Sequence, residues 1–326
     1  MKSTPLVSIC CTVYNHEHFV QDTIEGFLMQ EVDFPIEILI HDDASTDGSP
    51  DILRDYERRY PGLVHVIYQT ENQYSKGVRP FVHILFPQAR GKYIAMCEGD
   101  DHWTDPRKLS RQVAYLEANP DCVLTCGGYE IVSGNLRQRV VAREGEQPNG
   151  PADRGFSFAL SDMVRDWLTK TLTVVFRTNV QVGDELKGYE YLRDTHLFYH
   201  LMKKGRGYYF QDVMGVYNAH EGGVHSLVGR GVRKQSAYRV YRELHLRNRD
   251  PFTRIKAFNA TVGLIAHEVN DPGTRVDWKR HMRLIWEALL LVRSPSEFRK
   301  LCSAVIHRDW KDRLRRSQKG TSVSLS

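Results

Sequence analysis

The sequence has no apolar run long enough to cross a bilayer. The longest candidate, residues 284–292, is interrupted by Glu287, whereas a membrane-spanning helix needs about 20 apolar residues. The first five residues lead directly into an apolar, β-branched run and show no signal-peptide core. We therefore expect a cytoplasmic protein, and we leave open a peripheral position at the inner face of the plasma membrane.

Cysteine is scarce, and internal repeats are absent. Only Cys122 and Cys126, among six cysteines, are spaced like half of a metal-binding set. No second Cys or His pair lies at zinc-finger spacing. We interpret the cysteines in the apolar, strand-like runs as reduced core residues.

Net positive charge is lacking in the first two thirds of the chain. The whole sequence has a net charge of +5, but residues 227–326 hold 22 Lys/Arg and 9 Asp/Glu and carry +13, which leaves −8 for residues 1–226. No nucleic-acid motif accompanies the basic segment, so we expect no nucleic-acid partner. Two interpretations stay open: residues 227–326 either dock on an anionic membrane surface or form a packed helical subdomain with solvated charges.

Short apolar runs alternate with helical patterns up to residue 226, and only helical patterns follow. Strands are expected at residues 6–13, 36–40, 63–68, 93–97, 122–132, 172–177 and 213–217. Helices are expected from residue 19 to 28, after Ser49-Pro50 and Asp105-Pro106, near 160–168 and at 194–203. This alternation predicts an α/β fold with a mostly parallel sheet and flanking helices. Ligands of such sheets bind outside the carboxyl ends of the strands.

Two adjacent carboxylates, Asp42 and Asp43, directly follow the second expected strand. An aspartate there can accept a hydrogen bond from a nucleotide base or a ribose hydroxyl. The residues that follow, Ser45-Thr46-Asp47-Gly48, are also typical of a plain turn. The two interpretations stay open on this segment alone.

A denser acidic cluster, Glu98-Gly99-Asp100-Asp101, follows the buried run 93–97. Carboxylates this close repel one another unless a cation holds them, and oxygen-rich sites suit Mg²⁺ or Mn²⁺. Gly99 permits a tight backbone turn. We favour a metal–phosphate site over a solvated loop.

A third acid, Asp194, stands at the start of an expected helix. It is either a helix cap or a general base at the edge of a cleft. His196 and His200 have the i, i+4 spacing of zinc ligands, but without a glutamate between them we favour a structural role.

Together these segments resemble glycosyltransferase family 2, whose members are inverting enzymes with a GT-A nucleotide-diphospho-sugar transferase fold. Residues 7–9 with Thr12-Val13-Tyr14-Asn15 are similar to the family's opening strand and “YN” turn. Residues 38–48, ILIHDDASTDG, resemble its “DDGSTDG” nucleotide-binding segment, and residues 91–109 resemble its metal-binding “DxD” segment. Residues 216–226 are similar to its late “YRxHxxxxS” element. Three positions differ from the family pattern: Glu98 stands for Asp, Arg193 for Glu and Asn218 for Arg.

The resemblance implies a metal-dependent enzyme that transfers a sugar with inversion from a nucleotide-diphospho-sugar to an acceptor hydroxyl. Asp194 would be the catalytic base. Mn²⁺ or Mg²⁺ would be held by Asp101, Asp100, Glu98 and His220. The donor would contact Thr12, Tyr14, Asn15, Asp42, Asp43, Asp100 and Trp103, the last stacking on a sugar unless it is a packing residue.

The implied organisation is a GT-A catalytic domain over residues 1–226 and a basic helical region over residues 227–326. Residues 1–132 would bind the nucleotide-sugar, and residues 133–226 would supply the acceptor site and the base. Relatives that build bacterial surface polysaccharides suggest a sugar or a lipid-linked sugar as acceptor. The alternatives are a nucleotidyltransferase that makes nucleotide-sugars and a non-catalytic relative. The loop at residues 14–18 has no glycine or lysine to grip a phosphate, which argues against the former.

Overall fold

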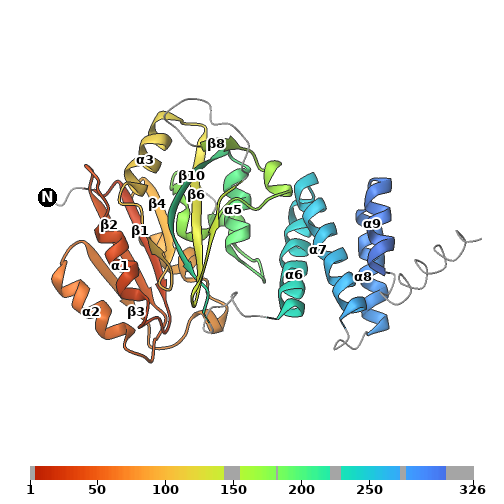
Figure 1. Ribbon diagram of the computed structural model, residues 1–326, viewed down its shortest axis with the longest axis horizontal. Helices are drawn as coiled ribbons and strands as arrows, with labels where there is room; N and C mark the ends of the chain where they lie inside the picture. Colours follow the sequence, from red (N-terminus) through yellow and green to blue (C-terminus); the bar gives the residue numbers. More distant parts are fainter. Residues whose placement is uncertain (1–3, 143–154, 181–182, 221–228, 272–276, 306–326) are drawn as a thin grey trace, which may run out of the picture. The chain divides into compact units, whose positions relative to one another are not determined.

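The computed structural model describes residues 4–142, 155–180, 183–220, 229–271 and 277–305. The chain divides into two compact units, residues 1–226 and residues 227–326. The described part of the first unit is built on one large sheet, and the described part of the second is helical (Figure 1). Residues 221–226 of the expected late element lie outside the described residues.

The sheet of the first unit has the strand order β3-β2-β1-β4-β9-β6-β10-β5. Its strands are β1 (Val7–Val13), β2 (Ile36–Asp42), β3 (Val64–Tyr68), β4 (Tyr93–Glu98), β5 (His102–Trp103), β6 (Cys122–Ser133), β7 (Leu136–Val140), β8 (Gly155–Phe158), β9 (Val175–Arg177) and β10 (Arg206–Asn218). Strands β1 to β4 are parallel, as are β6 and β10, whereas β9 runs antiparallel between β4 and β6. The carboxyl ends of β1, β2 and β4 therefore meet at one edge.

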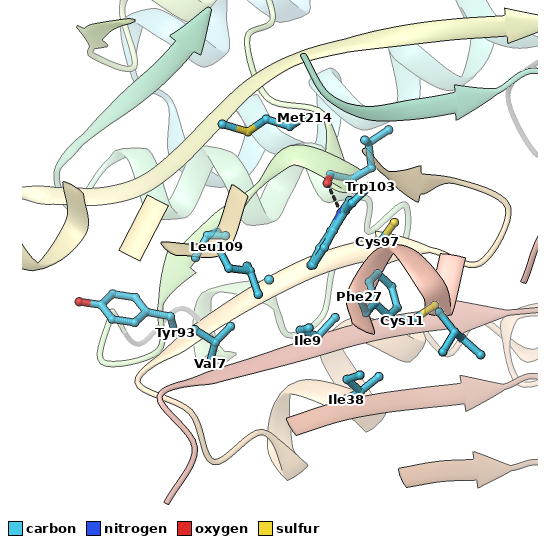
Figure 2. Close-up of a cluster of buried hydrophobic side chains, with 14 of the residues drawn as sticks. Val7, Ile9, Cys11, Phe27, Ile38, Tyr93, Cys97, Trp103, Leu109 and Met214 are labelled. Atoms are coloured by element: carbon cyan, nitrogen blue, oxygen red, sulfur yellow. Dashed lines mark hydrogen bonds between the residues drawn. The ribbon is translucent and has the colours of Figure 1, made fainter. Parts of the chain in front are cut away.

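Three helices cover one face of the first strands: α1 (Val20–Leu28), α2 (Ser49–Arg59) and α3 (Lys108–Ala118). The alternating side chains of Val7, Ile9 and Cys11 on β1 enter the apolar core beneath them (Figure 2). The other face is contacted by a short π-helical turn, η2 (Phe81–Leu85), and by α5 (Asp194–Met202). Burial on both faces explains why β1 and β4 are continuous apolar runs.

Trp103 belongs to this core and does not face a ligand. Its side chain is 1% exposed, its ring centroid lies 4.7 Å from that of Phe27, and its Nε1–H donates to the Leu172 carbonyl at 2.7 Å (Figure 2). The fully buried ammonium of Lys108 lies 3.9 Å from the same ring. The prediction that Trp103 stacks on a sugar is therefore wrong, because no face of the ring is free.

Two other expectations need correction. The helix expected near residues 160–168 is only a 3₁₀ turn, Asp162–Val164. The Asp162 carboxylate accepts the N–H of Ala159, a local bond that competes with helical pairing. The expected strand at 172–177 is shortened to β9, because Thr171–Thr173 form another 3₁₀ turn.

The second unit contains α6 (Arg230–Asn248), α7 (Pro251–Asn270), α8 (Trp278–Leu291) and α9 (Pro295–Val305). Helix α7 contacts the other three, and the apolar core of the unit includes Phe258, Ile265 and Leu284. The carboxylate of Asp250 caps α7 by accepting the N–H of Thr253. Across the described part of the chain, we find no helix with the length and apolarity that a membrane span requires.

Gly26 of α1 allows β5 to pass close to the helix. A Cβ atom at this position would lie 2.9 Å from both the backbone nitrogen and the carbonyl oxygen of Trp103. We expect Gly26→Ala to lower the free energy of unfolding by about 2 kcal/mol, because overpacked backbone must move. Denaturant unfolding measures this loss. The control is Gly183→Ala, whose Cβ meets nothing within 4 Å; an equal loss in both variants would contradict the explanation.

Candidate active site

The loops that follow β1 and β2 form the first wall of the site. Asn15 and Ala44 both have a left-handed backbone, with φ of 57° and 61°. Asparagine tolerates this conformation, but alanine is strained in it by about 1–2 kcal/mol. Ala44 occupies the position of a glycine in the resemblance described above. Local strain of this kind clusters at ligand sites, where the surrounding contacts enforce it.

Reciprocal hydrogen bonds join these two loops. The Asn15 amide oxygen accepts the N–H of Thr46 at 2.8 Å, and the Ser45 hydroxyl accepts the N–H of Asn15 at 2.9 Å. The Glu17 carboxylate accepts the N–H of Gly48 at 2.6 Å. The turn expected at residues 45–48 is thus part of a rigid frame, and Tyr14 stands beside it with its side chain 44% exposed.

Asp42 and Asp43 have different environments at the end of β2. Both oxygens of Asp43 accept backbone N–H groups, from Gln73 at 2.7 Å and Tyr74 at 3.0 Å. Asp42 Oδ1 is buried and has no partner among the described residues, and burial raises the pKa of this carboxyl. Asp43 therefore fixes the neighbouring loop, whereas one oxygen of Asp42 remains without a partner among the described residues.

The acidic turn after β4 is held by backbone contacts from β1 and α1. The Thr12 carbonyl accepts the N–H of Gly99 at 2.8 Å. The buried Thr23 hydroxyl lies 2.7 Å from the Asp101 carbonyl oxygen and 3.0 Å from the Gly99 carbonyl oxygen. A Cβ at Gly99 would lie 2.7 Å from Val13, so the turn depends on glycine there. These contacts fix the direction in which the carboxylates point.

Two carboxylate oxygens of this turn are buried and have no hydrogen-bond partner in the described part of the chain. They are Glu98 Oε2 and Asp101 Oδ2. Burial raises the pKa of Glu98 to about 7, and the nearby charges of Asp100 and Asp194 raise it too, whereas Lys170 lowers it. Burial, and then the charges of Asp100 and Glu98, also raise the pKa of Asp101. Burial and mutual repulsion therefore disfavour the charged forms of these carboxylates, and a positive charge beside them would stabilise those forms.

The end of β10 and the segment after it close the other side of the acidic turn. The Asn218 backbone N–H donates to Asp101 Oδ1 at 3.1 Å, and its side-chain amide donates to the Asp100 carbonyl at 2.7 Å. Asp100 Oδ2 lies 3.1 Å from Nε2 of His220 and 3.9 Å from Nε2 of His16. Asn218 thus performs a positioning role at the place where the resemblance has arginine.

Lys170 brings a positive charge to the acidic turn from the segment before β9. Its ammonium lies 3.6 Å from the centroid of the Tyr217 ring. Burial by itself would lower the pKa of Lys170, but the charges of Glu98 and Asp101, with smaller contributions from Tyr217 and Tyr129, together raise it above its usual value. The lysine is therefore an internal counter-ion for two of the carboxylates.

Asp194 begins α5 and is exposed. Its Oδ1 accepts the N–H of Thr195 at 2.7 Å, and its charge contributes to the raised pKa of Glu98. The N-cap of α5 is Arg193, whose backbone N–H donates to His196 Nδ1 at 3.1 Å. The carboxylate of Asp194 therefore faces solvent within electrostatic range of the acidic turn.

The structure thus brings together most of the predicted residues at the carboxyl edge of the sheet. They are Thr12, Tyr14, Asn15, Asp42, Asp43, Glu98, Asp100, Asp101, Asp194 and His220. Sequence reasoning missed His16, Thr23 and Lys170. The place of His16 next to the “YN” turn was a usable signal, but a lone threonine in a helix and a lone lysine in a loop offered none.

The family model described as “Glycosyl transferase family 2” matches residues 8–173, which is half of the chain. The chain belongs to glycosyltransferase family 2. The matched region contains the joined loops after β1 and β2, the acidic turn after β4, and Lys170, but it ends before Asp194 and His220. The family resemblance expected from the motifs is confirmed.

Two relatives that are similar in sequence differ in the share of each chain that aligns. The uncharacterized protein Rv1520 of Mycobacterium tuberculosis is 44% identical over 115 residues, which are 35% of this chain and 32% of that protein. The chain thus matches about a third of the length of that relative. The putative teichuronic acid biosynthesis glycosyltransferase TuaG of Bacillus subtilis is 26% identical over 245 residues, 74% of this chain and 88% of TuaG.

Solved glycosyltransferase structures share the fold. TarS of S. aureus, in complex with UDP-GlcNAc, superposes with a TM-score of 0.59 at 14% identity and covers 88% of this chain and 81% of its own. The mannosyltransferase PcManGT of Pyrobaculum calidifontis, in complex with GDP-Man and Mn²⁺, has a TM-score of 0.52 at 15% identity and covers 95% and 83%. The expected GT-A fold is confirmed.

We expect Lys170→Met to change both stability and cation affinity. Without a cation, the variant should lose about 2 kcal/mol of unfolding free energy, because buried carboxylates lose a counter-ion. Its affinity for Mn²⁺ should rise, because a competing positive charge is gone. Denaturant unfolding in EDTA and calorimetric Mn²⁺ titration measure the two effects. The control, Lys92→Met, removes an exposed lysine that pairs with Glu117; identical behaviour of the two variants would contradict the assignment.

Proposed function

We propose that this family member is an inverting, metal-dependent glycosyltransferase that uses a nucleotide-diphospho-sugar donor. The observation that carries the proposal is a pair of buried carboxylate oxygens, one on Glu98 and one on Asp101, that have no hydrogen-bond partner among the described residues. They lie at the same edge of the sheet as the loops after β1 and β2. A nucleotide and a cation supply the contacts that these acceptors lack. The complexes of TarS with UDP-GlcNAc and of PcManGT with GDP-Man and Mn²⁺ support this donor class.

The metal would be held by Asp101 with Asp100, Glu98 and His220. The donor set fits Mn²⁺ or Mg²⁺, since it is mainly carboxylate oxygen with one imidazole. Among the residues that the structure describes, no three such side chains are already grouped closely enough to hold an ion. We therefore infer that the ion would contact one or two of these four side chains directly, with Asp101 first, and would complete its shell with substrate phosphates. When bound, the ion would neutralise charge on the leaving nucleoside diphosphate.

The donor would lie along the joined loops that follow β1 and β2. Asp42 would accept a hydrogen bond from the base or the ribose, with Thr12, Tyr14 and Asn15 beside it. Asp43 would act indirectly by fixing the loop at Gln73 and Tyr74. Because hydrogen bonds hold these loops rigidly, the loops would orient the sugar before the reaction begins.

Asp194 would serve as the general base. An exposed carboxylate near the acidic turn is well placed to take the proton of an acceptor hydroxyl. The hydroxyl oxygen would attack the anomeric carbon on the face opposite to the leaving diphosphate. A single displacement of this kind inverts the anomeric configuration.

The acceptor would be a sugar or a lipid-linked sugar in cell-surface polysaccharide or glycolipid synthesis. TuaG, which is similar to most of this chain, is named for teichuronic acid synthesis. A screen of donor hydrolysis across UDP-, GDP- and dTDP-sugars with Mn²⁺ tests the proposed function. Release of nucleoside diphosphate from one donor is expected. A protein that binds a donor but cleaves none would instead be a non-catalytic relative.

We expect Asp101→Asn to abolish the dependence on a cation. The amide oxygen can still accept the Asn218 N–H, but the charge that attracts the metal is gone. Transfer should fall by about a hundredfold or more, and Mn²⁺ with nucleoside diphosphate should no longer raise the melting temperature. The control is Asp51→Asn, an exposed acid on α2. Undiminished transfer by Asp101→Asn would rule out this metal ligand.

We expect Asp194→Asn to keep donor affinity and lose transfer. Asparagine has the shape of aspartate but cannot take a proton, so only the chemical step should slow, by about a hundredfold or more. Calorimetry of donor binding and a rate assay separate the two effects. Asp184→Asn, in the first turn of α4 (Gly183–Leu186), is the matched control. If donor binding collapses together with the rate, Asp194 is a structural residue and the base lies elsewhere.

A further inference from the structure

Helix α8 of the second unit carries apolar side chains on two opposite faces. The inner face contributes Leu284 and Ala288 to the apolar core of that unit. On the other face, Trp278, Met282 and Trp286 follow one another at four-residue spacing, which aligns them along one side of a helix. They are 69%, 58% and 62% exposed. A helix that is apolar all round is ordinarily covered on every side, so the outer face indicates a partner.

Leu289 and Leu290 extend this exposed row by one more turn. We call Trp278, Met282, Trp286, Leu289 and Leu290 the outer stripe. In the described segment 278–293, every other exposed side chain is basic, namely Lys279, Arg283 and Arg293. The one acid of α8, Glu287, is partly buried and accepts hydrogen bonds from Tyr238 and Arg242. The exposed side of α8 therefore combines apolar and positive groups only.

A basic pocket of about 660 Å³ opens at the end of the stripe, within the same unit. Leu290 lines it together with four arginines, and these outnumber the two carboxylates of the lining, Asp250 and Glu287. The arginines are Arg242, Arg249, Arg254 and Arg293. Arg242 pairs with Glu287 and Arg254 pairs with Glu297, so Arg249 and Arg293 are the arginines that make this region positive beside the apolar stripe.

We propose that the outer stripe lies in the headgroup region of an anionic phospholipid bilayer. Tryptophan is enriched at membrane–water interfaces, and a helix with apolar and basic side chains on its exposed side lies in the interface plane. Lys279 and Arg283 stand beside the apolar row, where they meet lipid phosphates. The pocket beyond Leu290 accepts further phosphate groups.

The charge pattern favours a lipid surface over a second copy of the chain. Packing two outer stripes against each other would bring Lys279, Arg283 and Arg293 of one copy near the same residues of the other, and like charges repel. An anionic bilayer attracts all three. Helix α8 is 14 residues long, which is too short to span a membrane and suited to lying on one.

This proposal deepens the proposed function, on which it rests only for the idea that the acceptor is carried by a lipid. It predicts that α8 brings the enzyme to the surface where such acceptors reside. The binding test below involves no sugar transfer. Its outcome is therefore independent of whether the donor or the catalytic residues have been assigned correctly.

Co-sedimentation of the full-length protein with vesicles tests the proposal. One set of vesicles contains phosphatidylglycerol and phosphatidylcholine, and the other contains phosphatidylcholine alone. The apolar variant is Trp278→Gln with Trp286→Gln, and its control is Leu136→Gln with Val232→Gln, at two other exposed apolar residues. The charge variant is Lys279→Gln with Arg283→Gln, and its control is Arg58→Gln with Arg59→Gln on α2.

The intact protein and both controls should bind the anionic vesicles, and binding should weaken with salt. The apolar variant should bind at least about tenfold more weakly, and each lost basic residue should cost roughly fivefold. Because the replaced side chains are exposed, circular dichroism should show unchanged folding. Recovery of the intact protein in the supernatant with both vesicle types would overturn the proposal. Unchanged binding of the apolar variant would also overturn it, as would stripe-dependent dimerisation without vesicle binding.

Discussion

The fold of the first unit must hold several carboxylates close together in a largely buried position. Two like charges about 6 Å apart repel by on the order of 3 kcal/mol at an effective dielectric constant of 20. Glu98, Asp100 and Asp101 remain together because β4 is a central strand and because Thr23 and Asn218 hold the turn from both sides. The partly buried Lys170 offsets part of the repulsion. The remaining deficit of positive charge is what a divalent cation would fill.

The sheet converts this local constraint into a site. Strands β1, β2 and β4 are parallel neighbours, so their terminal loops meet at one edge. The loops after β1 and β2 are joined by hydrogen bonds that involve Asn15 and Glu17, and the Thr12 carbonyl reaches the acidic turn. The parts that would bind the nucleotide and the cation are therefore one rigid assembly. The proposed base, Asp194, comes from a separate helix.

The sequence predicted β1 to β4 and β6, and the acids at the ends of β2 and β4, because buried parallel strands are recognisable as apolar runs and ligands bind at their carboxyl ends. It did not predict β5, β7 or β8, and it placed β9 and β10 only in part. It did not predict which acids are free. Asp43 is used by backbone N–H groups, while Asp42 keeps an open oxygen, and only tertiary contacts distinguish them. The burial of Trp103 and the position of Lys170 likewise result from contacts between residues about 70 positions apart.

The most direct test is a crystal structure with Mn²⁺ and the nucleoside diphosphate of the preferred donor, with anomalous data at the manganese edge. The account predicts one strong anomalous peak in contact with the Asp101 carboxylate and the diphosphate, with the nucleoside beside Asp42. A peak in contact with neither Asp101 nor Asp100, or a nucleotide bound away from the carboxyl edge of β1, β2 and β4, would contradict it.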